Sequence, residues 1–167
     1  MRCEVFSTRR LLKADAAEFR RLRLEGLKRH PHAFGASFAA EVTQSLEVFA
    51  DGLERNVVFG GFDENALQGI VGFSRHQHAK MKHKGSLNAM YVSEAARGTG
   101  LAMQLVQALL AHARQDVELV QLTVTRSNVR ARRFYEKCGF GVYGVEPKAL
   151  KIEDDYLDEL LMWVSLV

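Results

Sequence analysis

Apolar residues along the chain follow two spacings, the alternation typical of β-strands and the wider spacing typical of amphipathic helices. Strand-like runs occupy residues 3–8, 56–62, 67–76, 87–92, 117–125, 140–145 and 157–167. Helical spacing predicts helices over residues 15–30, 39–54, 98–114 and 128–137. The expected element order is therefore β-α-α-β-β-β-α-β-α-β-β.

The ends of two predicted helices carry specific signals. Asp15 stands at the start of the first helix, and Glu18 completes a capping box with it. Gly139 follows the last helix, in the position where a left-handed residue closes a helix. Hairpins in the first half of the chain and a β-α-β crossover in the second predict an α/β fold of the α+β kind, with a mixed sheet and helices on its faces. We expect a single domain over residues 1–167.

Composition changes this picture little but limits the class of protein. The 167 residues carry a formal net charge of +3. The N-terminal residues contain no apolar run resembling a signal sequence, and no apolar stretch is long enough to span a membrane. Cys3 and Cys138 show neither metal-ligand nor disulfide spacing, which indicates reduced thiols. We therefore expect a cytoplasmic protein with no membrane partner.

Part of the positive charge lies in short clusters, such as Arg130, Arg132 and Arg133. Such clusters are ordinarily solvated faces, although they also favour a polyanionic ligand, either a nucleotide cofactor or a nucleic acid. No aromatic stacking motif accompanies Arg126 and this cluster. We therefore expect no nucleic-acid partner.

The segment Arg97-Gly98-Thr99-Gly100-Leu101-Ala102 leads from a predicted strand into a predicted helix. A glycine-rich turn at a helix start gathers unpaired N–H groups and the positive end of the helix dipole, which makes an anion site. Relief of backbone strain in a tight connection would also explain the glycines. A dinucleotide fingerprint does not fit: Glu118 lies where its acid belongs, but Met103 occupies the third glycine position.

A second segment, Asn128-x-x-Ala131-x-x-x-Tyr135, begins the last predicted helix. Taken alone, Asn128 is a good N-cap, and Tyr135 shares a helical face with apolar residues. Taken together, the two segments resemble two motifs of the GNAT superfamily of N-acetyltransferases. These are the acyl-CoA motif (Arg or Gln, two residues, Gly, one residue, Gly or Ala) and the Asn-x-x-Ala-x-x-x-Tyr helix. The Gly139-Phe140 pair matches the family's usual ending of that helix.

This resemblance implies a GNAT-like N-acyltransferase domain that uses acetyl-CoA as cosubstrate and no metal. The pyrophosphate would bind the glycine-rich turn, at Arg97, Gly98, Thr99, Gly100, Leu101, Ala102 and Met103. The pantetheine arm and the acetyl carbonyl would bind Met90, Tyr91, Val92 and Asn128. Tyr135 would protonate the departing CoA thiolate, since a phenol with a pKa of about 10 suits a thiol with a pKa of about 8.5.

The resemblance further implies direct acetyl transfer to a primary amine of a small molecule or protein. Some members of the family take the amine proton with a Glu five residues before the Asn, but Thr123 occupies that position. The base stays open between Glu41, the Asp158-Glu159 pair and a water relay. The acceptor pocket is expected between the first two helices and the final hairpin, which contain Phe34, Phe38, Glu41, Tyr143 and Tyr156.

Three histidines, His76, His78 and His83, lie close together in the sequence. No nearby Cys or acid completes a metal-ligand set with them, so we expect a solvated strand end, in which one of them is another candidate base. Because no base is evident, a CoA-binding or interaction domain without catalysis is the alternative function. A homodimer, common in the resembled family, is also consistent with the sequence.

Overall fold

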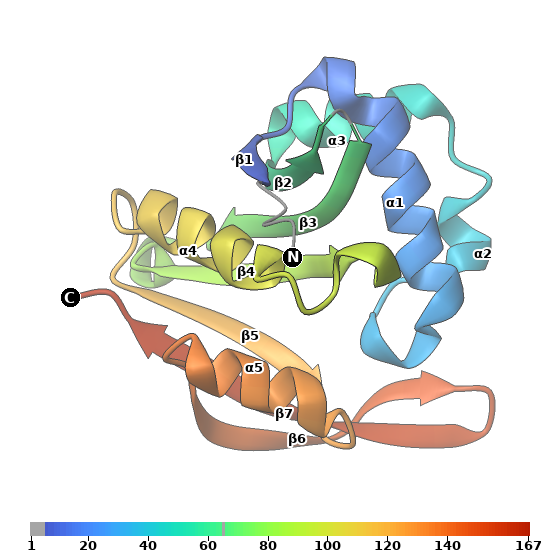
Figure 1. Ribbon diagram of the computed structural model, residues 1–167. Coiled ribbons are helices and arrows are strands. Elements are labelled where there is room, and N and C mark those ends of the chain that lie inside the picture. The colour runs from blue at the N-terminus through green and yellow to red at the C-terminus, as the bar shows by residue number, and fades with distance from the viewer. Residues whose placement is uncertain (1–5, 65) are drawn as a thin grey trace.

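The computed structural model of the protein describes residues 6–64 and 66–167, which fold around a seven-stranded mixed sheet (Figure 1). Its strands are β1 (Ser7–Arg10), β2 (Val57–Asp63), β3 (Ala66–Arg75), β4 (Lys84–Val92), β5 (Leu119–Thr125), β6 (Gly141–Ile152) and β7 (Asp155–Ser165). Their spatial order is β1-β2-β3-β4-β5-β7-β6. β4 and β5 run parallel, and the other neighbouring pairs run antiparallel. The predicted α/β class with a mixed sheet is confirmed.

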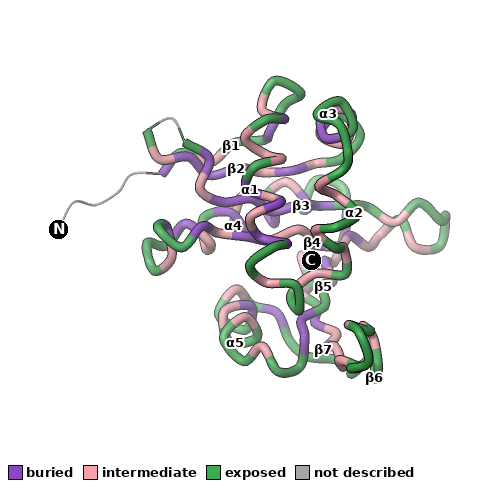
Figure 2. Tube along the Cα trace, turned by 90° about the vertical axis from the view of Figure 1, so that its right-hand side faces the viewer, coloured by how far each residue is buried: buried purple, intermediate pink, exposed green. Residues whose placement is uncertain are grey.

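Helices cover both faces of this sheet. They are α1 (Ala16–Arg29), α2 (Phe38–Glu41), α3 (Leu46–Arg55), α4 (Leu101–Ala113) and α5 (Val129–Lys137). Successive side chains of β3 point to opposite faces. Ile70 belongs to the buried cluster under α1 and α3, whereas Val71 belongs to the cluster that α4 and α5 cover. The periphery, with α2 and most of β6, is exposed (Figure 2).

Glycines in β2 and β3 let α4 approach the sheet closely. A Cβ on Gly61 would overlap Leu101 Cδ1, and one on Gly69 would lie 2.8 Å from Leu105 Cδ1. Both leucines are fully buried. The first turn of α4 is therefore held against the sheet by contacts that require a bare backbone.

We expect Gly61→Val to lower the free energy of unfolding by about 1–3 kcal/mol, because the added methyl groups push into Leu101. Chemical denaturation measures this loss. Gly141→Val in β6 is the matched control, since a Cβ there meets no heavy atom within 4 Å. Equal effects of the two substitutions would show that the close approach of α4 does not depend on Gly61.

Two details of the predicted helices were wrong. The predicted helix over 39–54 is two helices, α2 and α3, separated by an extended backbone at Ser45 that begins α3. Asp15 precedes α1, but its carboxylate accepts the Leu12 amide and the Arg9 guanidinium instead of capping α1. Glu18 bonds to Arg21, so the predicted capping box does not form. Asp15 is thus engaged by Arg9 and Leu12, and Glu18 by Arg21 one turn along the same helix, instead of by each other's backbone.

The predicted strands were mostly right in number and order but wrong at their ends. Of the first one, residues 3–5 lie outside the described part of the chain, and β1 continues to Arg10. β4 starts three residues before the predicted run, at Lys84. The final hairpin is longer than predicted, because β6 extends to Ile152 and β7 begins at Asp155.

Candidate functional site

The two segments singled out in the sequence meet at one edge of the sheet. β4 and β5 are parallel, so the turn after β4 and the turn after β5 lie at the same edge. Met90, Tyr91 and Val92 end β4, and the glycine-rich turn follows them. Asn128 begins α5 just after β5. In open α/β sheets this edge is where ligands bind.

β4 and β5 are paired over only part of their length. Their register runs from Lys84 to Ser86 on β4 and ends at the pair Ser86–Gln121. Further along β4, Ala89 and Met90 lie opposite the single residue Val71 of β3, and Ala89 has a positive φ of 52°. Such a bulge bends and twists its strand. The second half of β4 therefore turns away from β5 and has no strand partner on that side.

The turn after β4 has the geometry of an anion site. Gly98 and Gly100 have positive φ values of 78° and 90°, and a Cβ on either would meet no heavy atom within 4 Å. Gly100 is the N-cap of α4 and offers no side chain to its first amides. The amides of Gly98, Gly100 and Met103 make no hydrogen bond to any residue in the described ranges. Open space, free N–H groups and a helix start therefore coincide, as a phosphate group requires.

The remaining residues of the turn differ in what they offer a ligand. Leu101 is fully buried, so only its backbone is available. Thr99 donates its hydroxyl to the carbonyl of Ala96. Met103 packs toward α5, with its sulfur 3.7 Å from Cys138 Sγ. Of the turn residues, it is therefore mainly the backbone that faces the open space.

Arg97 points back from the turn toward the end of α1. Its guanidinium donates to the carbonyl of Val92 and lies 2.8 Å from His30 Nε2. Burial and the neighbouring Arg97 charge lower the pKa of His30. A neutral imidazole is the form that accepts this hydrogen bond. His30 was not among the site residues predicted from the sequence. Its position between the end of α1 and Pro31 is the one feature of the sequence that points to a role at this turn.

Asn128 confirms the simpler of its two interpretations. Its side-chain oxygen accepts the amide of Ala131 at 3.1 Å and caps α5. The side-chain NH2 group keeps both donors for another partner. Capping and ligand binding are therefore compatible in this residue.

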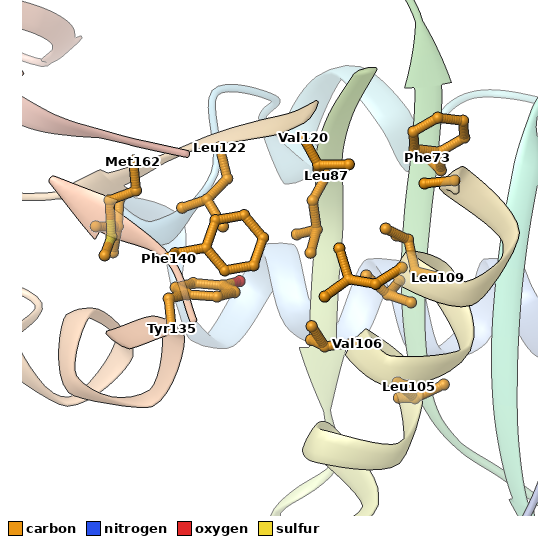
Figure 3. Packing of buried hydrophobic residues seen from close by; sticks show 14 of the residues in the cluster. Phe73, Leu87, Leu105, Val106, Leu109, Val120, Leu122, Tyr135, Phe140 and Met162 are labelled. Atoms are coloured by element: carbon orange, nitrogen blue, oxygen red, sulfur yellow. The ribbon is translucent and has the colours of Figure 1, made fainter. Parts of the chain in front are cut away.

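Tyr135 lies in the core beside Phe134 and Phe140, with 7% of its surface exposed. Figure 3 shows its hydroxyl directed from α5 toward the side of Leu87 on β4. The hydroxyl makes no hydrogen bond within the part of the chain that the structure describes. Burial raises the pKa of Tyr135, so the phenol stays protonated throughout the physiological range. Burial likewise raises the pKa of the nearby Cys138 thiol to about 11.

Two hollows flank the segment between α1 and α2. The first has a volume of about 320 Å³, and His30, His32, Thr125 and Asn128 are among its lining residues. The second, of about 340 Å³, lies between this segment and the β6–β7 hairpin. Pro31 lines both. The first hollow therefore adjoins the start of α5, and the second opens where the acceptor pocket was expected.

Two of the residues expected in that pocket line the second hollow, namely Phe34 and Phe38. Glu41 does not, because both its carboxylate oxygens bond to Arg23, at 2.8 and 3.0 Å. Tyr143 instead accepts a hydrogen bond from Gln121 on the sheet, and Tyr156 lies under the lysines of the hairpin. A hollow therefore lies where the acceptor pocket was expected, but Glu41, Tyr143 and Tyr156 are not among its lining residues.

The candidate bases are also bound elsewhere. The ion pair with Arg23 engages Glu41, and Asp158 accepts the amide of Lys148 and lies 3.5 Å from Arg126. His76 Nε2 lies 3.3 Å from the hydroxyl of Ser86, at the opposite end of β4 from the glycine-rich turn. Among the described residues, no group of three or more His, Cys, Asp and Glu side chains is placed to hold a metal.

Comparison with known proteins identifies the family of this chain. The Acetyltransferase (GNAT) family matches residues 18–140 of the chain. The chain belongs to the GNAT acetyltransferase family. This match spans α1 to α5 and includes the glycine-rich turn and Tyr135. It places the protein among enzymes of acetyl transfer.

Solved GNAT structures share the whole fold. One is yncA from Salmonella typhimurium, solved with its cofactor acetyl-CoA, at a TM-score of 0.86 and 19% identity over 98% of this chain and 95% of that one. A GNAT acetyltransferase from Streptococcus pneumoniae has a TM-score of 0.84 and 22% identity over 96% of this chain and 99% of that one. The ribosomal-protein-alanine N-acetyltransferase from Brucella melitensis has a TM-score of 0.81 and 20% identity over 95% and 99%. At these identities the likeness establishes the fold.

Within residues 6–64 and 66–167, every helix is too short or too polar to cross a membrane.

Proposed function

We propose that this GNAT protein transfers the acetyl group of acetyl-CoA to a primary amine. The observation that carries the proposal is the turn after β4. It offers free amides and open space at two left-handed glycines, at the edge where β4 separates from β5. Pyrophosphate suits this turn, since helix N-termini with free N–H groups bind phosphate. Bound acetyl-CoA supplies the acetyl group as a thioester.

The chain's own residues would orient the reactants, and one of them would hold a proton near the departing sulfur. The unpaired edge of β4, from Met90 to Val92, offers backbone groups to the pantetheine arm, and the Asn128 amide offers its two donors. Tyr135 holds a proton on its hydroxyl and, in this proposal, donates a hydrogen bond to the departing sulfur. Its raised pKa makes complete proton transfer to the thiolate less favourable. The role proposed for Tyr135 is therefore to stabilise, through this hydrogen bond, the negative charge that develops on the departing sulfur.

The amine must lose a proton before it attacks. The hollow beside Asn128 has no acidic lining residue in the described chain. His30 also lines it, but its Nε2 already accepts a hydrogen bond from Arg97. His32, alone or through water, therefore replaces the carboxylates as the candidate base.

A second function is favoured by one observation, the absence of a free carboxylate at either hollow in the described structure. In that case the domain binds CoA without turnover. Saturable binding of acetyl-CoA without release of free CoA, whatever amine is added, would identify it.

The proposal predicts release of free CoA thiol when the protein is mixed with acetyl-CoA and an accepted primary amine. A thiol reagent measures the release, and mass spectrometry identifies the acetylated product. Acetyl-CoA without amine, and the amine replaced by the corresponding alcohol, are the controls. Acetyl-CoA binding without turnover over a broad panel of amines would overturn the proposal and support the binding domain.

A further inference from the structure

The second hollow, between the α1–α2 segment and the β6–β7 hairpin, has a distinct chemistry. Leu27, Phe34, Phe38 and Leu150 give it apolar walls. Its volume of about 340 Å³ lies at the lower end of the roughly 300–1,000 Å³ typical of sites for small molecules. The hairpin and the segment touch here, since a Cβ on Gly35 would lie 4.0 Å from Leu150 Cδ2. A small apolar group fits such a space.

The charges at this hollow are all of one sign. Lys28 of α1 and Lys151 of β6 are among its lining residues, and no acidic residue of the described chain is. The Lys28 ammonium lies 5.8 Å from the centre of the Phe38 ring, which also lines the hollow. The Lys151 side chain points to the face of β6 opposite to Leu150 and packs on Tyr156, outside the hollow. Lys28 forms no ion pair within the described ranges, so its ammonium is available to an anionic group of a ligand.

The nearest candidate for neutralising this charge is already engaged. Glu41 of α2 bonds to Arg23 through both oxygens, and the two side chains are about 15–17% exposed. Arg23 also lies over the Phe34 ring at 5.4 Å. This ion pair braces the wall that carries Phe34 and keeps the carboxylate away from Lys28. An acceptor with additional positive charge would meet the Lys28 ammonium and no counter-charge.

We propose that this hollow is the acceptor site and that it selects a small amine carrying both an apolar side chain and a carboxylate, the chemistry of an apolar amino acid. This inference rests on the proposed acetyltransferase function. The apolar walls bury the side chain, and Lys28 binds the carboxylate. Polyamines and other multiply cationic amines are disfavoured because like charges repel.

Matched acceptor pairs test the inference: leucine against leucinamide, and phenylalanine against phenethylamine, with spermidine as the polycation. We expect kcat/KM for the carboxylate member to exceed that of its partner by about tenfold, through KM. Lys28→Ala should shrink that ratio by roughly threefold to tenfold. Lys80→Ala, on an exposed turn away from the hollow, is the control and should leave the ratio unchanged.

The outcomes separate the two levels of the proposal. Turnover with equal preference, or with spermidine preferred, overturns the carboxylate inference and leaves the acetyltransferase function standing. The same follows if Lys28→Ala lowers kcat/KM for both members of a pair equally, with an unfolding midpoint that matches the wild type. Acetyl-CoA binding with no turnover of any of these amines overturns both.

Discussion

We expect the Gly100→Trp variant to fold and to gain no stability from acetyl-CoA. A Cβ on Gly100 would meet no heavy atom within 4 Å, and the indole beyond it would occupy the place proposed for the pyrophosphate. The positive φ of 90° costs a non-glycine residue about 1–2 kcal/mol. The variant should therefore unfold roughly 2–8 °C below the wild type and still unfold cooperatively.

The measurement is thermal unfolding at increasing acetyl-CoA concentration. A ligand at one hundred times its Kd stabilises the folded state by about 2.7 kcal/mol, which raises the midpoint of a domain of this size by roughly 5–11 °C. The wild type should show this rise and Gly100→Trp should not. Gly52→Trp on α3 is the matched control, because a Cβ at Gly52 also meets no heavy atom within 4 Å. A rise of equal size in Gly100→Trp would move the cofactor away from this turn.

We expect Tyr135→Phe to reduce kcat by about 10²–10⁴ while leaving acetyl-CoA binding intact. The substitution removes one hydroxyl and keeps the ring that packs against Phe134 and Phe140. Because that hydroxyl has no hydrogen-bond partner in the described structure, its removal leaves no orphaned group behind. The variant should therefore lose activity while it keeps the stability of the wild type.

Steady-state kinetics and thermal unfolding of the same preparation test this separation. A kcat equal to that of the wild type would remove Tyr135 from the proposed stabilisation of the departing sulfur and leave it as a core residue. A fall in kcat accompanied by loss of the acetyl-CoA-induced rise would instead make it a binding residue. The role proposed for Tyr135 requires kcat to fall while the acetyl-CoA-induced rise of the unfolding midpoint stays unchanged.

The sequence was most informative where structure depends on neighbours along the chain. The turn from Arg97 to Ala102, the Asn128 cap and the Gly139 helix end are all local, and each appears where its motif predicts. Asp15 shows the opposite, because its carboxylate bonds to the Arg9 guanidinium of β1 and does not cap α1. A local signal holds only while no tertiary partner competes for it.

The place of the second hollow was expected, but its lining could not be predicted in the same way. Lys28 and Leu150 are far apart in the sequence and line one hollow only because the hairpin folds against the α1–α2 segment. Glu41 carried the right charge for a cationic acceptor, but its bonds to Arg23 are visible only in the folded molecule. The bulge at Ala89 was equally hidden, since no glycine marks its positive φ. These features arise from contacts between distant elements.

The unpaired part of β4 is an edge strand in the interior of a sheet. Free strand edges at a protein surface invite pairing with other chains, which leads to aggregation. Here β5 diverges from β4 after their pairing ends at Ser86, and α4 and α5 cover the adjoining face. A second polypeptide strand would have to displace packed helices to reach this edge, whereas a slender ligand would not. The fold thus keeps strand hydrogen-bonding groups open to a slender ligand while shielding them from pairing with another chain.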